Sequence, residues 1–323
     1  MQRRHLPVAL AATTIAPAVL AQTMVTDLAL TTAAGTLTGL PGETALLFEA
    51  EGPKGRIRVA HRDAAPIFVG SAVKTFILAA YLLAVEQGRL SLTEQLPVND
   101  DVRSPVSPVL GNLTGTAPAV VALEAMITHS DNTATDMAIR RVGPAAVRSL
   151  IAARQLAGTR IPDSTRIMVS ALAGAPPGTD LGWAAIKALD DGAPIPSPRP
   201  PMNDVSTMVS TGQDMVAWYA YVLGGGLFAK PETLATFKRI QAMATAMPEI
   251  APPNVIAYGK GGSITWEDAQ ALAVAGQMVA GPVRATFFYG VNWTGEDASV
   301  PRVTGTAIEQ FRILLARSLA TLA

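Results

Sequence analysis

The chain has 323 residues, in which 25 basic side chains balance 25 acidic ones. A net charge of zero gives no reason to expect a nucleic acid or an anionic membrane as partner. The sequence contains no cysteine, which excludes disulfides, thiolate metal sites and a cysteine nucleophile. Its histidines, His5, His61 and His129, are too scattered for a typical zinc site, so we expect neither a metal nor a cofactor.

The first residues have the pattern of a secretory signal. Arg3 and Arg4 precede an apolar run, 6–20, that ends in small residues. We expect a signal peptide over 1–21, cleaved after Ala21, and therefore a periplasmic or secreted protein. A stable membrane anchor is the less favoured alternative, because the run contains two prolines and is shorter than the roughly 20 apolar residues that span a bilayer.

The first half of the chain predicts a hairpin followed by helices. Two apolar segments flank the turn signal 52–55, which is typical of paired strands. The next segments have helical apolar spacing and end at Gly or Gly-Pro. The expected strands are 45–50 and 57–61, and the expected helices are 71–87, 120–127, 132–141 and 145–154.

The second half returns to strands after a region rich in Gly and Pro. This region, 172–201, is predicted to be an exposed insertion or cover that contains a short helix over 182–189. Two further helices, three successive antiparallel strands and a closing helix follow. Their expected ranges are 210–223 and 231–243 for the helices, 255–264, 271–279 and 283–293 for the strands, and 304–320 for the last helix.

The order of these elements predicts an α/β fold of the α+β type. Strands at both ends of the chain favour one antiparallel sheet, flanked by helices and built from both termini. The helical middle then forms an all-helical lobe inserted into the sheet lobe. We place the α/β lobe at 22–65 with 206–323 and the helical lobe at 66–205, and we expect a catalytic cleft between them.

The first candidate for chemistry is Ser71-Ala72-Val73-Lys74. A serine hydroxyl becomes a strong nucleophile only when a base removes its proton, and a lysine in apolar surroundings can be that base. Residues three apart on a helix share a face, so Ser71 and Lys74 are expected to bond side chain to side chain. Taken alone, the pattern is better explained by a capping serine beside a solvated lysine. A Ser-His-Asp triad through His129 is less favoured, because Lys74 is the better base.

Two further motifs follow in order. Ser130-Asp131-Asn132 comes directly after an apolar helix, and Lys260-Gly261-Gly262-Ser263 ends an apolar strand. Singly, the first is explained by a helix cap and the second by a hairpin turn. Ser-x-x-Lys, Ser-Asp-Asn and Lys-x-Gly in this order are together the signature of penicillin-binding proteins and class A β-lactamases. The chain thus resembles a class A-type β-lactamase domain over essentially its whole mature length.

The resemblance implies roles for individual residues. Ser71 resembles the acylated serine, Lys74 its proton acceptor, and Ser130 the shuttle that protonates the leaving nitrogen or oxygen. The backbone N–H groups of Ser71 and Ser263 are implied to form the oxyanion hole.

The remaining implied residues bind the substrate. Asn132 resembles the amide that holds Lys74 and the substrate side chain, and Lys260 the cation that supports Ser130 and attracts a carboxylate. Gly262 permits the close approach of a backbone or ligand.

The sequence departs from the family pattern in two places. Gly261 stands where the family has a Thr or Ser hydroxyl that binds a carboxylate, and Ser263, on the same strand face, is the expected substitute. The segment 159–168 contains no Glu where class A enzymes carry their deacylating base, and Asp163 is its one carboxylate. Pro162-x-Ser164-Thr165-Arg166 is more similar to a branch with β-lactamase-like esterases and the β-lactamase-like protein of clavulanic acid gene clusters.

We therefore expect a serine hydrolase that acts on a small-molecule substrate. The favoured function is opening of β-lactam amides through an acyl-enzyme on Ser71, with slow deacylation. The alternatives are an esterase or amidase of the same fold, and a penicillin-binding sensor that stays acylated. Peptidoglycan transpeptidation is less favoured, and a monomer is expected.

Overall fold

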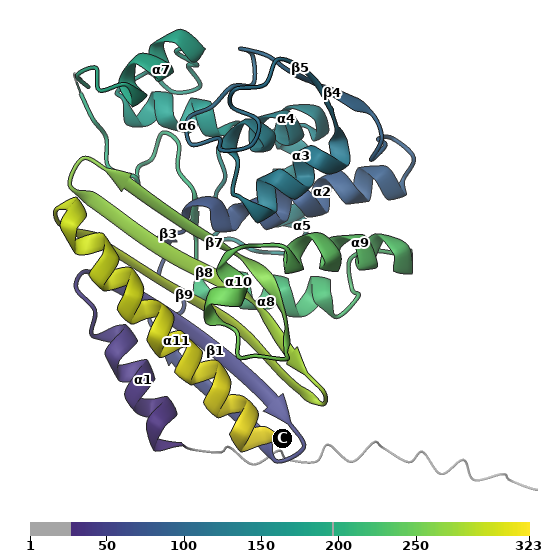
Figure 1. Ribbon diagram of the computed structural model, residues 1–323, viewed down its shortest axis with the longest axis vertical. Coiled ribbons are helices and arrows are strands. Elements are labelled where there is room, and N and C mark those ends of the chain that lie inside the picture. The colour runs from purple at the N-terminus through teal and green to yellow at the C-terminus, as the bar shows by residue number, and fades with distance from the viewer. Residues whose placement is uncertain (1–26, 196) are drawn as a thin grey trace, which may run out of the picture.

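The computed structural model describes residues 27–195 and 197–323, so the expected signal peptide, 1–21, lies outside the described residues. Figure 1 shows a sheet with long helices across it in the lower half and a group of shorter helices in the upper half. Strands from both ends of the chain meet in the sheet, which confirms the predicted fold class. The lobe boundaries at 66 and 205 stay a prediction.

The sheet has five strands in the order β2-β1-β9-β8-β7, and every neighbouring pair is antiparallel. The predicted hairpin and the predicted three-strand run both form. The first and last segments meet where β1 pairs with β9, with Leu47 opposite Phe288. The strands are β1 Glu43–Gly52, β2 Gly55–His61, β7 Ile256–Trp266, β8 Ala269–Ala280 and β9 Val283–Thr294.

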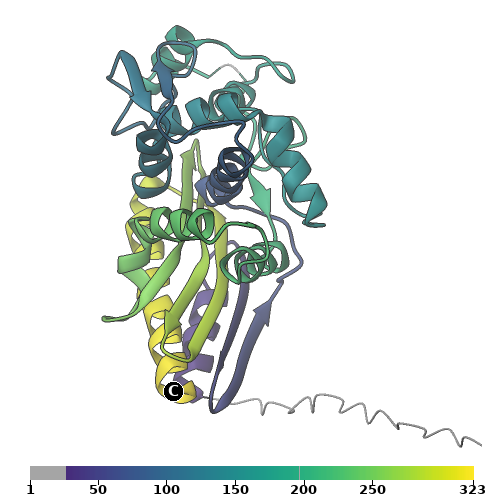
Figure 2. The ribbon, with the colours of Figure 1, turned by 90° about the vertical axis from the view of Figure 1, so that its right-hand side faces the viewer.

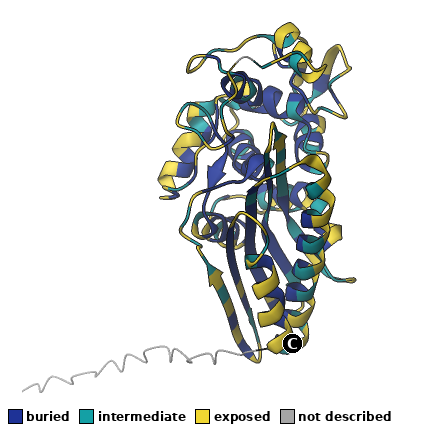
Figure 3. Ribbon diagram, turned by 90° about the vertical axis from the view of Figure 1, so that its left-hand side faces the viewer, coloured by how far each residue is buried: buried dark blue, intermediate teal, exposed yellow. Residues whose placement is uncertain are grey.

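Helices cover both faces of this sheet. The first helix, α1 (Leu28–Thr38), lies beside the last, α11 (Val300–Leu322), across one face (Figure 1). The helix α8 (Gly212–Leu223) packs on the other face, where it contacts β1, β8 and β9. The covered strands carry buried side chains on both faces, and Figure 3 shows this central layer as buried while the outer side of α11 is exposed. Helix α1 was not predicted, because its Ala- and Thr-rich sequence carries little apolar periodicity.

The upper lobe is built around α2. Every residue of α2 from Lys74 to Leu82 is buried, because the other helices of this lobe surround it, and Figure 2 shows them stacked above the sheet. Helix α6 was not predicted. The helices of this lobe are α2 Lys74–Glu86, α3 Ala119–Thr128, α4 Asn132–Val142, α5 Pro144–Ala153, α6 Thr165–Leu172 and α7 Trp183–Asp190.

Short elements connect the lobes. Strand β3 pairs with β6, one at each passage of the chain between the two lobes, and a single 3₁₀ turn, η1, leads from β3 into α2. A second small sheet, β4 with β5, lies in the helical lobe. The remaining elements are β3 Ile67–Phe68, η1 Gly70–Val73, β4 Gln95–Val98, β5 Gly115–Pro118, β6 Val209–Ser210, α9 Pro231–Ala242, α10 Ala246–Ile250 and η2 Asp297–Ser299.

One buried carboxylate fixes the turn between α3 and α4. Asp131 caps α4 by accepting the N–H of Ala134 at 2.8 Å. Its other oxygen accepts the N–H groups of Val109 and Leu110 at 2.8 and 2.9 Å. Asp131 therefore ties the neighbouring Ser130 and Asn132 to the 105–110 loop.

We expect Asp131→Ala to lower the free energy of unfolding by about 3 kcal/mol or more. Loss of the cap costs about 1 kcal/mol, and two further buried N–H groups lose a charged acceptor at about 1–3 kcal/mol each. Urea denaturation followed by circular dichroism measures this change. Asp131→Asn, which keeps one acceptor oxygen, should lose less, and an alanine variant that unfolds at the wild-type midpoint would contradict the analysis.

Candidate active site

Ser71 lies in the 3₁₀ turn η1, directly before α2. The structure therefore differs from the prediction of an α-helix that begins at Ser71, although Ser71 still occupies the head of the helix. Strand β7 presses against this turn at Gly262, where an added Cβ would lie 2.1 Å from Val69 O and 2.7 Å from Ser71 N. Only glycine fits at this contact. Gly262 was predicted to permit the close approach of a backbone. In the structure, that backbone is the turn that carries Ser71.

Ser130 lies in the turn between α3 and α4 with a left-handed backbone, φ 59°. This conformation is uncommon for a non-glycine residue, and such residues cluster at functional sites. It directs both the carbonyl and the hydroxyl of Ser130 toward Lys74. The Nζ of Lys74 donates to Ser130 O at 2.6 Å and lies 3.3 Å from Ser130 Oγ.

Asn132 completes the surroundings of Lys74. The Nζ of Lys74 donates to Asn132 Oδ1 at 2.7 Å, and Asn132 Nδ2 donates to Pro105 O at 2.8 Å, which fixes the orientation of the amide. The expected bond between Ser71 and Lys74 side chains is not among the hydrogen bonds of the described residues. The two shortest contacts of Lys74 Nζ are instead with Ser130 O and Asn132 Oδ1.

The charge state of Lys74 follows from its burial. The side chain is fully buried, and desolvation together with the positive charge of Lys260 holds the pKa of Lys74 well below its usual range. A neutral lysine amine keeps two N–H donors and gains a lone pair. With its two N–H groups on Ser130 O and Asn132 Oδ1, the free lone pair can accept a proton from a serine hydroxyl.

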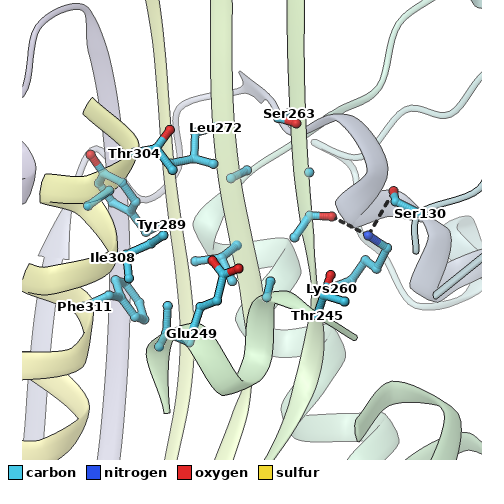
Figure 4. A pocket seen from close by; sticks show the side chains of 17 residues that line it. Ser130, Thr245, Glu249, Lys260, Ser263, Leu272, Tyr289, Thr304, Ile308 and Phe311 are labelled. Atoms are coloured by element: carbon cyan, nitrogen blue, oxygen red, sulfur yellow. Dashed lines mark hydrogen bonds between the residues drawn. The ribbon is translucent and has the colours of Figure 1, made fainter. Parts of the chain in front are cut away.

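Lys260 approaches Ser130 from strand β7. Its Nζ donates to Ser130 Oγ at 3.1 Å and to Gly261 O at 2.7 Å, as the dashed lines in Figure 4 show. Burial lowers the pKa of Lys260 to about 7. Ser130 Oγ therefore lies between two lysine nitrogens, and burial lowers the pKa of both.

Two clefts meet at these residues. The first, which we call the Ser71 cleft, has a volume of about 490 Å³ and contains Ser71, Asn132 and Thr165. The second, the Lys260 cleft, has a volume of about 230 Å³ and lies between β7, β8, α10 and α11. Ser130 and Ser263 line both clefts. The structure thus brings together six of the predicted residues, Ser71, Lys74, Ser130, Asn132, Lys260 and Ser263, with Gly262 between the last two.

The Lys260 cleft lacks the hydroxyl that the family pattern has after the lysine. Gly261 leaves this position without a side chain, and Ser263 is the nearby hydroxyl on β7. Glu249 of α10 lies on the same cleft, with apolar side chains such as Leu272 and Ile308 around it (Figure 4). Among the described residues that line this cleft, Lys260 is the one cationic side chain, and Glu249 opposes it with a negative charge.

The segment 159–168 is held to the site by a residue that sequence reasoning missed. Asp136 of α4 is buried and accepts the N–H of Thr165 at 2.6 Å and of Arg166 at 3.1 Å. Burial raises the pKa of Asp136 to about 6. Asp136 follows Asn132 by one helical turn, and this spacing was the available signal. As a result, Thr165 lines the Ser71 cleft, together with Met168 of the same segment.

Arg166 anchors the same segment to its surroundings. Its guanidinium forms a bidentate pair with Asp180, with Nε at 2.8 and 2.9 Å from the two carboxylate oxygens. The other nitrogens donate to the carbonyls of Asp100, Asp101 and Arg103. The Ser-Thr-Arg sequence thus has three structural functions, because Ser164 caps α6, Thr165 faces the cleft and Arg166 fixes the helix in place.

Asp163 lies outside the Ser71 cleft. Its carboxylate pairs with Arg148 at 2.5 Å, both side chains are 47% exposed, and the residue lines a separate surface depression with Pro162 and Asn203. Among the described residues that line the Ser71 cleft, Asp190 is the one acid, and it is exposed. The cleft therefore places no buried carboxylate beside Ser71.

Residues 27–195 and 197–323 contain neither a metal-binding cluster nor a membrane-spanning helix. In these ranges, no group of three or more His, Asp or Glu side chains is arranged to hold a metal ion. None of the helices in this part of the chain is long and apolar enough to cross a membrane.

Comparison with solved structures identifies the fold. PBP-A matches with a TM-score of 0.69 and 17% identity over 93% of this chain and 98% of PBP-A. A β-lactamase from Sphaerobacter thermophilus DSM 20745 matches with a TM-score of 0.68 and 17% identity over 91% and 96% of the two chains. An ancestral class A β-lactamase matches with a TM-score of 0.67 and 18% identity over 90% of this chain and 99% of the ancestral chain. The protein therefore has the β-lactamase/transpeptidase fold.

The family is shown by sequence. The family model described as the Beta-lactamase enzyme family matches residues 37–271, more than two thirds of the chain. The chain belongs to this family and is a β-lactamase-like hydrolase. No match was found among curated protein sequences.

The lowered pKa of Lys260 predicts how the rate of acylation depends on pH. Lys260 is charged below its pKa of about 7 and loses this charge as the pH rises through that value. Acylation should therefore decline above about pH 7, because Ser130 then loses its cationic donor. Lys260→Arg, which stays protonated in proteins, should remove this alkaline decline. Second-order rates of serine labelling measured across about pH 5 to 9 test this, and a wild-type rate that keeps rising through the upper range would contradict it.

Proposed function

We propose that the protein is a serine hydrolase that forms an acyl-enzyme on Ser71. The observation that carries this proposal is the arrangement of Lys74, whose N–H groups are bound by Ser130 O and Asn132 Oδ1 while burial lowers its pKa and so favours the neutral amine. A base in this state can take the proton of the Ser71 hydroxyl as its oxygen attacks a substrate carbonyl. PBP-A, a mutant of which is described as an acyl-enzyme complex with penicillin G, shares the fold and supports the proposal.

The proton then has a route to the leaving group. As the bond from the carbonyl carbon to the leaving nitrogen or oxygen breaks, that atom takes the proton of Ser130 Oγ. Lys74, which holds the Ser71 proton, lies 3.3 Å from Ser130 Oγ and returns a proton to it. The acyl group stays on Ser71 as an ester, and the N–H groups of Ser71 and Ser263 stabilise the oxyanion.

Release of the acyl group needs a base for water. With Asp163 paired to Arg148 on the surface and Asp190 exposed at the rim, the described part of the Ser71 cleft offers water no buried carboxylate. A positioned general base contributes about 100- to 10,000-fold. Deacylation is therefore the slow step of β-lactam turnover.

A second candidate function is hydrolysis of an ester or amide without a carboxylate. Gly261 removes the hydroxyl expected to bind a β-lactam carboxylate, and Glu249 adds a negative charge to the Lys260 cleft. The charge of Glu249 offsets part of the attraction that Lys260 exerts on a carboxylate, whereas a neutral leaving group is not affected. This observation favours esterase or amidase activity over efficient β-lactam hydrolysis.

We expect Ser71→Ala to abolish covalent labelling by penicillins and fluorophosphonates while leaving the fold intact. Lys74→Ala should lose nearly as much labelling, because nucleophile and base act as a unit. Intact-protein mass spectrometry measures the adduct, and circular dichroism checks the fold of each variant. Labelling of the alanine variant at another serine would show that the nucleophile assignment is wrong.

We also expect a burst when nitrocefin is mixed with the enzyme. About one equivalent should react quickly and a slow phase should follow, because acylation outruns deacylation. Linear, fast turnover without a burst would contradict slow deacylation. A lasting adduct without any slow phase would instead indicate a penicillin-binding sensor.

Thr165→Glu should accelerate the slow phase. Thr165 lines the Ser71 cleft at the start of α6, so a carboxylate there can reach water beside the ester. We expect a gain of roughly tenfold to 100-fold, less than a fully positioned base supplies. Stopped-flow measurement of the slow phase tests this, with Thr165→Gln as the control of equal size, and equal rates for the two variants would contradict the argument.

A further inference from the structure

The walls of the Ser71 cleft are apolar over most of their area. Helix α6 contributes Met168, Val169 and Leu172, and helix α7 contributes Ile186 and Leu189. The opposite wall comes from the residues around the nucleophile and from the end of β7. Its apolar members are Phe68, Met208, Ile264 and Trp266.

The reacting groups of this cleft come from other elements than its apolar walls. Ser71, Ser130 and Asn132 mark the reacting end, whereas Ile186 and Leu189 lie on α7, the helix that covers the cleft. The one acid among the described lining residues, Asp190, is exposed. The cleft thus combines a reactive polar end with an apolar body of a size that suits a small ligand.

The apolar walls are held in place by polar contacts behind them. Arg166 pairs with Asp180 and so joins the start of α6 to the segment before α7. Arg199 donates to the carbonyls of Ala171 and Ala175 and thereby ties the end of the cover back to α6. These contacts keep the cleft open as a formed cavity, which lowers the cost of binding an apolar group.

The two clefts divide the substrate between them. Ser130 protonates the leaving atom and is bound to Lys260, so the leaving group extends toward the Lys260 cleft. The acyl group, which remains on Ser71, then extends into the Ser71 cleft. An acyl group there contacts apolar side chains from α6 and α7 and meets no buried charge.

We infer that the Ser71 cleft is a binding site for an aliphatic acyl chain, and that the substrate is an ester of such a chain with a neutral leaving group. This inference rests on the proposed acyl-enzyme at Ser71. Each methylene buried in an apolar site contributes about fourfold to the specificity constant. The enzyme therefore selects its substrate by chain length, through α6 and α7.

The test uses p-nitrophenyl esters from acetate to octanoate, each below its micelle-forming concentration. With the wild-type protein, kcat/KM should rise about fourfold for each added methylene until the chain fills the cleft. A specificity constant that is flat or falls across the series, with acetate still hydrolysed through Ser71, overturns the inference and leaves the proposed function standing.

A pair of neighbouring substitutions locates the chain. Leu189→Trp fills part of the cleft and should lower the ratio of kcat/KM for octanoate to kcat/KM for acetate by roughly tenfold to twentyfold, the equivalent of two lost methylenes. Ala188→Trp places the same side chain on the exposed side of α7 and should leave the whole series unchanged. If Leu189→Trp hydrolyses octanoate as well as Ala188→Trp does, the chain does not lie in this cleft.

Failure of the proposed function has a different result. If Ser71→Ala hydrolyses the acetate and octanoate esters as fast as the wild-type protein, Ser71 is not the nucleophile. The proposed acyl-enzyme and the proposed acyl-chain site are then both wrong. If only the dependence on chain length is missing, the acyl-chain site is wrong and the proposed acyl-enzyme stands.

Discussion

The site depends on one hydroxyl that is shared by two buried lysines. Ser130 Oγ lies 3.3 Å from Lys74 Nζ and 3.1 Å from Lys260 Nζ, inside a protein interior where two charges of the same sign repel strongly. Desolvation lowers both pKa values, and the charge of Lys260 lowers that of Lys74 further. The same surroundings thus favour the neutral amine at Lys74, which also feels the charge of Lys260. The left-handed turn at Ser130 and the cap at Asp131 hold this arrangement in place.

The sequence predicted the parts of the molecule that local patterns encode. The strands of the sheet and the helices around residues 71–87, 120–127 and 132–141 have strong apolar periodicity, and they form close to their expected ranges. The site residues were predicted because three weak motifs occur in a fixed order, and only one known arrangement explains them together. Their geometry shows why this works, since Ser130 bonds to lysines that lie 56 and 130 positions away along the chain.

Other features depend on contacts that no local pattern encodes. Helix α6 begins where Asp136 accepts two backbone N–H groups from across the lobe, and the segment itself gave only a Pro-Asp-Ser turn signal. The acidic residue nearest in sequence, Asp163, faces Arg148 on the surface, whereas Thr165, two residues later, faces the cleft. The bond expected between Ser71 and Lys74 was inferred from helix spacing, which says nothing of the competing acceptors Ser130 O and Asn132 Oδ1.

The close approach of Gly262 to the turn of Ser71 has a consequence for the reactivity of the chain before it folds. Strand β7, the turn of Ser71 and the turn of Ser130 come from segments far apart in sequence, and they meet only in the folded chain. In an unfolded chain both lysines regain ordinary pKa values and are protonated at neutral pH. Ser71 is then an ordinary alcohol without a base. The reactivity expected of Ser71 is therefore a property of the completed tertiary structure, and the same serine in an unfolded chain reacts no faster than any other serine.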